Sequence, residues 1–418
     1  MAMERRRRPE KTAQAPQRRR PMTREQAQAA EERRQLHAEK QREMESLARG
    51  PIDLTFLLLV LLLTAIGLVM LLSASFPSAY NDPKIQDPTY FFTRQGVFAI
   101  LGIAAMLIVS KINYRRFRSM AKPVLFLAIV LLFLVIVPGV GITRNNATRW
   151  LGIPGTPLQF QPSEIAKMAV VLYFGDTISK KKDQMQSFRT GILPYGVWFA
   201  IIAGLMMLEP HLSGTVLILG TGAVMMLVGG IQWKWVIGGL SAAAVLGWLV
   251  IGVFGYGQSR IEMWFNPFID PRGAGYQLCQ SLLSIGSGGL LGVGLGKSRQ
   301  KFMFLPEEHN DFIFAIVCEE LGLIGATLIM MLFAALILRG YWIALHARDR
   351  FGSLLVVGVI SLIAMQTFLN ISVVTGFLPT TGISLPFFSY GGTALSMQLA
   401  EMGIVLSVSR QMKPPKAG

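Results

Sequence analysis

Long apolar runs alternate with short polar segments from about residue 52 to the end of the chain. Ten of these runs approach the length of about twenty residues that an α-helix needs to cross a membrane. They lie at 52–74, 94–110, 122–139, 163–178, 192–208, 212–230, 235–254, 312–338, 354–377 and 392–409. The pattern predicts an all-α polytopic membrane protein with about ten transmembrane helices.

Basic residues between the spans orient the chain. The segments 111–122, 179–189 and 339–350 carry five, four and three Lys or Arg residues. Because such residues gather on the cytoplasmic side of a membrane, we expect both termini to lie in the cytoplasm.

The segment 276–296 is apolar enough to resemble an eleventh span, but it contains six glycines. If it crossed the membrane, the basic segment 339–350 would face outwards, against the usual bias. We therefore expect a long extracellular loop, residues 255–311, between the seventh and eighth spans, with half-inserted helices lying against the bundle.

The composition agrees with a membrane protein: 52% of the 418 residues are hydrophobic and 15% are charged. The net charge of +16 is uneven, since residues 1–50 hold 14 Lys and Arg against 8 Glu. We expect this region to be a basic cytoplasmic tail, partly disordered, with a polar helix over about 23–49. Such a tail favours anionic lipid or a protein as its partner, and we expect no nucleic acid. The membrane domain would cover 51–411, before a cytoplasmic C-terminal tail at 412–418.

The polar residues of 306–311, PEEHND, run directly into the eighth span. Loss of hydration at the mouth of a span disfavours the charged form of a carboxylate, so its pKa can rise towards the range of a general base. The titratable members of this cluster, Glu307, Glu308, His309 and Asp311, are the candidates. The structural alternative is that Asn310 or Asp311 caps the first helical turn.

Two charged residues lie inside the fourth span. Glu164 and Lys167 are three positions apart, so they share a helical face and can pair. Buried charges in a membrane face a cavity or one another, which leaves a structural ion pair and a substrate site as alternatives. Ser163 is the expected cap of this helix.

Other polar residues inside the spans favour structural hydrogen bonds. Glu319 and Glu320 are adjacent, point about 100° apart and would need separate partners. Glu401 lies in the tenth span. Gln366 and Asn370, four residues apart, could bond across helices.

Two external segments carry further candidates. The first is the long loop before the eighth span, which carries the basic residues Arg272, Lys297, Arg299 and Lys301. Basic residues on the outside go against the usual bias, so they predict an anionic ligand such as a phosphate. The second, 375–392, is rich in Gly and Pro, and we expect Ser389 and Tyr390 to be exposed there. The two cysteines and four histidines are too few and too scattered to predict a disulfide framework or a protein-bound zinc.

Several motifs together resemble the family of shape, elongation, division and sporulation proteins, the FtsW/RodA/SpoVE-type polymerases of peptidoglycan. They are RWLG at 149–152, QPSEIAK at 161–167, DPRGAGYQLCQSLLSIGSGGLLGVGLGKSRQK at 270–301, FLPEEHNDFIFAIVCEELGLIG at 304–325 and TTGISLPFFSYGG at 380–392. The resemblance covers the chain after about residue 52. The long basic tail favours FtsW-type members over RodA-type ones, and a sporulation paralogue stays open.

This resemblance implies a peptidoglycan glycosyltransferase in the cytoplasmic membrane of a bacterial cell, active in septal cell-wall synthesis. Its substrate would be lipid II, which carries undecaprenyl pyrophosphate. Asp311 matches the essential aspartate of the family and would deprotonate the acceptor sugar hydroxyl, which attacks with inversion. Mg or Mn could assist departure of the pyrophosphate. The implied partners are a class B penicillin-binding protein, which is a transpeptidase, and other division proteins.

Of the charged residues, Glu164 and Lys167 match the intramembrane pair of the family. Together with the polar segments described above they give the predicted substrate-binding or supporting residues, which are Glu164, Lys167, Arg149, Lys297, Lys301, Glu308, His309, Ser389 and Tyr390. The chain departs from the family where EPHLSGT at 209–215 replaces a QPDLGT-like segment, so His211 stands in place of an acidic residue, and where Asn310 replaces a threonine. A lipid II flippase and a non-catalytic division scaffold are the alternative functions.

Overall fold

The structure, a computed structural model, describes residues 50–144, 147–152, 159–252 and 258–412. The predicted tails and the prolines at 154 and 157 lie outside these residues. The described residues belong to one compact unit.

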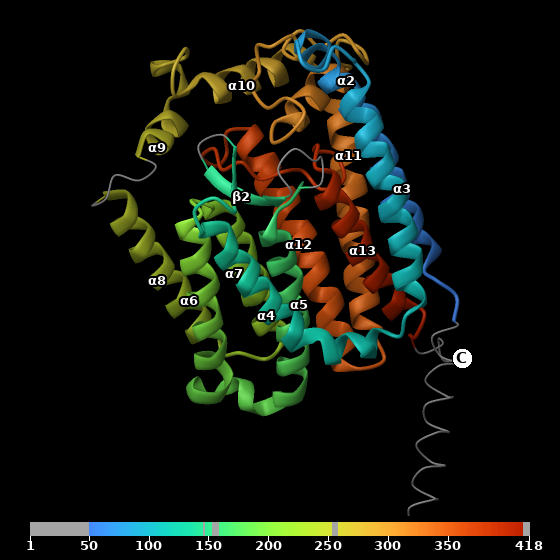
Figure 1. Ribbon diagram of the computed structural model, residues 1–418, viewed down its shortest axis with the longest axis vertical. Coiled ribbons are helices and arrows are strands. Elements are labelled where there is room, and N and C mark those ends of the chain that lie inside the picture. Colours follow the sequence, from blue (N-terminus) through green and yellow to red (C-terminus); the bar gives the residue numbers. More distant parts are fainter. Residues whose placement is uncertain (1–49, 145–146, 153–158, 253–257, 413–418) are drawn as a thin grey trace, which may run out of the picture. The chain divides into compact units, whose positions relative to one another are not determined.

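Each of the ten predicted spans coincides with a helix of the described chain (Figure 1). They are α2 (Leu54–Asn81), α3 (Tyr90–Lys111), α4 (Phe117–Ile136), α5 (Pro162–Lys181), α6 (Leu193–Leu208), α7 (Leu212–Val228), α8 (Trp233–Gly252), α11 (Ile313–Leu345), α12 (Arg350–Val374) and α13 (Gly392–Ser409). In the described part, six of them, α2, α3, α4, α6, α11 and α12, are long and apolar enough to cross a membrane by length and composition alone, if α4 is counted from Tyr114 and α6 from Phe188, with the short helical turns that precede them. The predicted fold class is confirmed.

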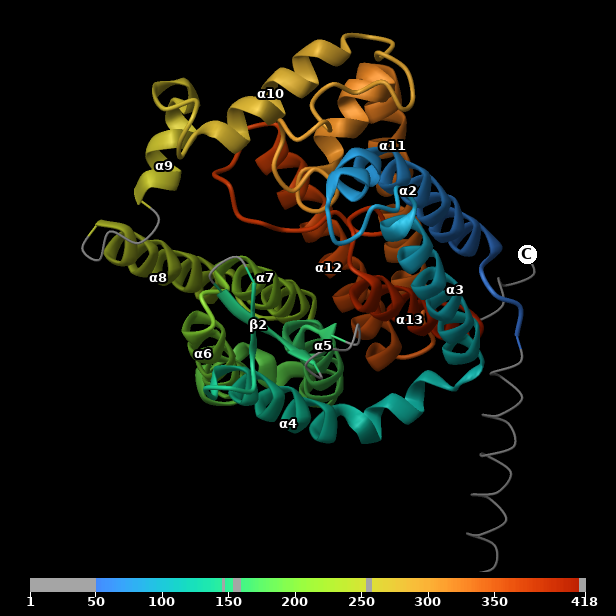
Figure 2. The same ribbon diagram turned by 45° about the horizontal axis from the view of Figure 1, so that its top comes forward.

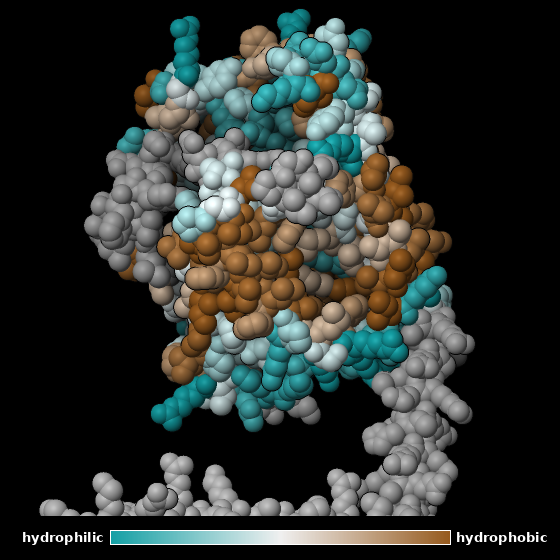
Figure 3. All heavy atoms as spheres, in the orientation of Figure 1, coloured by the Kyte–Doolittle hydropathy of each residue, from teal (hydrophilic) through white to brown (hydrophobic). Residues whose placement is uncertain are grey.

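The helix α12 forms the centre of the bundle. It packs against α5, α7, α11 and α13. In its most apolar stretch of 18 residues, 72% of the residues are buried. The outer helices instead expose large apolar side chains such as Ile100 on α3 and Phe126 on α4. Figure 3 shows an apolar band across one face with polar side chains on either side of it, as expected of a surface in contact with lipid.

The external segments add elements that the sequence did not predict. Three short antiparallel strands, β1 (Ile142–Arg144), β2 (Ala147–Gly152) and β3 (Gln159–Phe160), pair in the order β1-β2-β3. The loop between α8 and α11 contains α9 (Gln258–Phe265), a 3₁₀ turn and α10 (Tyr276–Gly288). Figures 1 and 2 show α10 lying across one end of the bundle, as predicted for a segment that does not cross the membrane.

The helix α11 is broken near its outer end, and the glycine-rich loop repairs the break. Gly322 has φ 65° and ψ −170°, which no helical residue adopts. The backbone N–H groups of Val293 and Gly294 donate to the carbonyls of Glu319 and Glu320, each at 3.0 Å. Broken helices occur in membranes where protein partners satisfy the freed backbone groups, so this loop stabilises the break.

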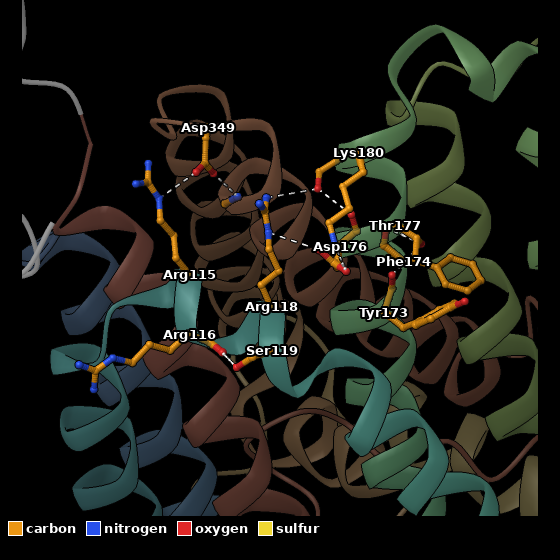
Figure 4. A network of polar contacts seen from close by, with 12 residues as sticks. Arg115, Arg116, Arg118, Ser119, Tyr173, Phe174, Asp176, Thr177, Lys180 and Asp349 are labelled. Carbon is orange, nitrogen blue, oxygen red and sulfur yellow. Dashed lines mark hydrogen bonds and ion pairs between the residues drawn. The ribbon is translucent and has the colours of Figure 1, made fainter. Parts of the chain in front are cut away.

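Ion pairs join the helix ends on the predicted cytoplasmic side (Figure 4). Asp176 on α5 lies 3.3 Å from Arg118 of α4 and 2.6 Å from Lys180. Arg115 lies 3.1 Å from Asp349, whose side chain also caps α12. The basic residues that orient the chain therefore also connect α4, α5 and α12.

Candidate active site

The carboxylate of Asp311 lies immediately before α11, at the end of this helix that is predicted to face outwards. This helix begins at Ile313, and its cap residue Phe312 makes no side-chain cap hydrogen bond. The alternative in which Asn310 or Asp311 caps the first turn is therefore wrong. Asn310 instead donates its amide to the carboxylate of Glu307.

The Asp311 carboxylate forms no hydrogen bond or ion pair with any residue that the structure describes, although it is partly buried. Burial raises the pKa of Asp311 to about 6, and the nearby charge of Glu307 acts in the same direction. Arg149 and His309 act against this rise. A carboxylate with this pKa is ionised at neutral pH and is matched to accepting a proton.

The backbone around Asp311 is held by a buried amide. Asn370 on α12 donates from Nδ2 to the carbonyl of Asp311 at 2.7 Å and to that of Ile383 at 2.6 Å. This residue was predicted to bond across helices, and it joins the loop before α11 to the loop before α13. A Cβ added to Gly382 would lie 3.2 Å from Oδ2 of Asp311, so the second loop closely approaches the carboxylate.

Ser389 and Tyr390 hold the same segment from its other side. Oγ of Ser389 donates to the carbonyl of Asn310 at 2.7 Å, and the backbone N–H of Tyr390 donates to the carbonyl of His309 at 2.9 Å. Gln95 on α3 donates to the carbonyl of Ser389 at 3.1 Å. The prediction that both residues are exposed is wrong, because these bonds leave Ser389 buried and Tyr390 partly buried.

An aromatic cluster lies next to Asp311 on the α3 side. The ring of Phe91 lies 4.6 Å from that of His309 and 4.8 Å from that of Tyr390, measured between centroids. The buried carboxylate of Glu308 approaches Nδ1 of His309 at 3.4 Å. The predicted residues His309, Glu308 and Tyr390 are thus brought together around Asp311, and Phe91 is a neighbour that sequence reasoning missed.

Arg149 lies on the sheet side of the site. Its guanidinium on β2 donates to the carbonyl of Glu209 at 3.3 Å and also to the carbonyl of Pro210. In the same turn between α6 and α7, Nε2 of His211 lies 2.8 Å from Nε2 of Gln161. The functional importance of this turn was not predicted, yet the turn positions the cation that acts electrostatically on Asp311.

Two titratable groups of this turn have strongly shifted pKa values. Burial raises the pKa of Glu209 to about 8, although Arg149 opposes the shift. Burial also lowers the pKa of His211 to about 3, and the positive charges of Arg149 and Lys167 lower it further. Both groups are therefore largely uncharged at neutral pH. The positive charge beside this turn comes from Arg149 of β2, which donates to its carbonyls.

The predicted pairing of Glu164 with Lys167 is confirmed, with 2.7 Å between Oε2 and Nζ. Both residues lie in α5, within electrostatic reach of the buried Glu401 of α13. Ser163 is not the helix cap, because α5 already begins at Pro162 and the buried Oγ of Ser163 has no partner among the described residues.

Lys301 is not a free external cation. Its Nζ lies 2.9 Å from Glu320 and 3.1 Å from Ser73 of α2, and the side chain is buried. Glu319 accepts from Ser298 and Ser284, so both glutamates have structural partners, as predicted. Among the other basic residues of the loop, Arg272, Lys297 and Arg299 are exposed.

The described residues contain no group of three or more His, Cys, Asp or Glu side chains arranged to hold a metal ion. The two carboxylates nearest the proposed base, Glu307 and Glu308, already contact Asn310 and His309. Among the described residues, the groups that the site offers to a substrate are the Asp311 carboxylate and the Arg149 guanidinium.

Comparison with known proteins finds relatives that match most of the chain and that belong to one family. The family description of the FtsW, RodA and SpoVE cell cycle proteins matches residues 53–414. A probable peptidoglycan glycosyltransferase FtsW of Geobacter sulfurreducens is 43% identical over 363 residues, covering 86% of this chain and 96% of that protein. The stage V sporulation protein E of Bacillus subtilis is 43% identical over 360 residues, covering 86% of this chain and 97% of that protein.

Solved structures agree with this result. A chain of a peptidoglycan synthase complex, described as coordinating polymerization and crosslinking, superimposes with a TM-score of 0.72 at 28% identity, covering 86% of this chain and 98% of that one. The rod shape determining protein RodA of Thermus thermophilus gives a TM-score of 0.64 at 27% identity, covering 87% and 99%.

Proposed function

The chain belongs to the FtsW, RodA and SpoVE family of cell cycle proteins, and we propose that it is a peptidoglycan glycosyltransferase with Asp311 as its general base. The relatives named for this activity are similar over most of the chain. The observation that carries the assignment of the base is the carboxylate of Asp311, held at the outer end of α11 with a pKa of about 6 and with no partner among the described side chains.

In the proposed reaction, Asp311 accepts the proton of a sugar hydroxyl on the acceptor. The hydroxyl oxygen forms a bond to the anomeric carbon of the donor sugar, and the bond from that carbon to the donor diphosphate breaks. The electron pair leaves with the diphosphate, whose developing negative charge Arg149 stabilises from the sheet side of the site. One inverted glycosidic bond, one polyprenyl diphosphate and one protonated Asp311 result.

The donor and acceptor are lipid II and the growing strand that it forms, at the outer face of the cytoplasmic membrane. The similarity to a chain of a complex that couples polymerization to crosslinking supports a class B penicillin-binding transpeptidase as the partner. The basic segments joined by Asp176 and Asp349 support an orientation with both termini in the cytoplasm. Mg or Mn would enter the site bound to the diphosphate of the substrate.

Polymerisation of lipid II by the purified full-length protein tests this function. Asp311→Asn keeps the size of the side chain and should lower the rate by about 10² to 10⁴, the usual contribution of a general base. The matched control is Asp87→Asn, which neutralises an exposed external carboxylate and should leave the rate unchanged.

Unchanged polymer from a folded Asp311→Asn protein would contradict the assignment of the base. Transport of lipid II across a bilayer without polymer, by the unmodified protein, would instead favour a flippase. Absence of both activities, with binding of division proteins retained, would favour a scaffold.

A further inference from the structure

An apolar groove runs along the outer halves of α4 and α6, on the surface that faces lipid. Its volume is about 740 Å³, and the nine residues that line it are Gly204 and eight residues with apolar side chains. Phe133 and Leu134 of α4 form one wall, and Ile201 and Leu208 of α6 form the other. The volume falls within the range of sites for small organic ligands, about 300–1,000 Å³.

Gly204 keeps the groove open. A Cβ added to this residue would have no other atom within 4 Å, so the space next to its backbone is empty of protein. Phe133 and Leu208 are 59% and 67% exposed and stand on either side. The groove is therefore an open channel between two packed helices that a flexible apolar chain can enter from the bilayer.

Arg149 lies across the outer end of this groove. The strands β1 and β2 follow directly after α4, and a Cβ on Gly141 would press against both Val135 of α4 and Thr148 of β2. From β2, Arg149 donates to the carbonyls of Glu209 and Pro210, immediately after the last residue of α6. The cation thus bridges the ends of the two helices that form the groove.

We propose that this groove binds the polyprenyl chain of the donor substrate, with the diphosphate at Arg149 and the sugar directed towards Asp311. The proposal rests on the function proposed above. A lipid-linked donor has an apolar chain, a dianionic diphosphate and a sugar in that order, and the groove, the cation and the carboxylate follow the same order.

An ordinary phospholipid chain is the competing occupant, since every open groove in a bilayer is filled by lipid. Arg149 favours the polyprenyl diphosphate, because it places a cation at the point where the chain leaves the apolar region and the diphosphate carries two negative charges there. A phospholipid presents a single phosphate at this point, so an anionic phospholipid is the stricter competitor.

The first experiment fills the groove. Gly204→Phe places a ring in the channel, and the matched control, Gly196→Phe, adds the same ring two turns earlier on α6, where a Cβ is also unobstructed. We expect Gly204→Phe to raise the apparent KM for lipid II by about tenfold, the loss of roughly two buried methylene contacts. The kcat should stay unchanged, and Gly196→Phe should match the unmodified protein.

The second experiment does not depend on polymerisation. Full-length protein in phospholipid nanodiscs is irradiated with a polyprenyl diphosphate that carries a diazirine on its chain, and the labelled peptides are mapped. We expect labels on 129–134 and 200–208, which excess unlabelled polyprenyl diphosphate removes and excess phosphatidylglycerol does not. Gly204→Phe should lower this labelling at least fivefold, and Gly196→Phe should not.

The outcomes separate the two proposals. Specific labelling of the groove by a protein that makes no polymer would refute the glycosyltransferase function and retain the binding site. Polymer formation with labelling that phosphatidylglycerol removes equally well would show an ordinary lipid in the groove and overturn the inference. Labelling that is specific but lies outside 129–134 and 200–208 would also overturn it.

Discussion

Gly382 offers a test of how closely the base must be positioned. Its backbone has φ +70°, and a Cβ built on it would lie 3.2 Å from Oδ2 of Asp311, closer than ordinary van der Waals contact. The substitution Gly382→Ala therefore has two effects. It introduces a side chain into left-handed backbone, and it displaces the carboxylate by a few tenths of an ångström.

The two effects can be separated with a second glycine. Gly376 in the same segment has φ +73°, but its Cβ would meet Leu282 and Leu278 of α10 at ordinary distances of 3.6 and 3.7 Å. Both alanine variants should lose about 1 kcal/mol of folding free energy from backbone strain. Only Gly382→Ala should lower kcat, by about three- to tenfold, because a misplacement of about 1 Å costs about 10² in rate.

Initial rates of lipid II polymerisation over a range of substrate concentrations give the comparison, with thermal unfolding of each variant in the same detergent. We expect a lower kcat with little change in KM for Gly382→Ala, and kinetics like those of the unmodified protein for Gly376→Ala. Equal losses of kcat in the two variants would show that strain in the loop, and not the contact with Asp311, controls the rate. That result would refute the reasoning.

Three further predictions concern the base Asp311, the buried pair of Lys301 and Glu320, and the buried amide of Asn370. The kcat/KM should fall about tenfold per pH unit below pH 6 and level off above pH 7, because Asp311 must be deprotonated to accept a proton; a flat profile between pH 5 and 8 would exclude this base. Lys301→Met should destabilise the protein by about 3–5 kcal/mol, because Glu320 is left buried without its cation, and adding Glu320→Leu should recover much of this loss. Unfolding midpoints of the single and double variants measure this recovery, and a further loss of stability in the double variant would contradict the prediction. Asn370→Leu leaves two loop carbonyls without a donor and should lower both stability, by about 1–3 kcal/mol, and kcat; a stable variant with normal kcat would show that this clamp is unnecessary.

The hydrophobic pattern was sufficient to place the membrane helices. Ten runs of span length each coincide with a helix, because a chain in lipid must satisfy its backbone groups within the helix. The glycine-rich segment 276–296 was also correctly predicted not to form an eleventh span. Its positive-φ glycines, Gly289, Gly292, Gly294 and Gly296, end α10 and prevent a continuous span.

The partners of buried polar residues could not be predicted, because they come from distant parts of the chain. Glu320 accepts from Ser73, 247 residues earlier, and shares Lys301 with it. Local pattern marked Lys301 as a basic loop residue, and only the folded loop buries it. The same limitation applies to Ser389, whose exposure was predicted from its Gly- and Pro-rich surroundings and whose partner is the carbonyl of Asn310.

The short strands and the break in α11 could not be predicted from the sequence, because both depend on local patterns that are too weak to recognise. The strands β1–β3 have three, six and two residues, too few to show a clear alternation of apolar and polar positions. Gly322 lies inside an apolar run, where a glycine is compatible with an intact helix. Its break is stable because the loop from Gly289 to Gly294 supplies the missing hydrogen bonds.

These buried polar residues explain how a site made of loops can hold a base in a fixed place. Asp311 and Gly382 lie in segments without regular structure, which by themselves would be mobile. Asn370 comes from α12, the central helix of the bundle, and Gln95 comes from α3; both donate to loop carbonyls from inside rigid helices. Because a buried polar group left unpaired is costly, these bonds hold each loop against a helix of the bundle. The position of the carboxylate therefore depends on how α3 and α12 pack.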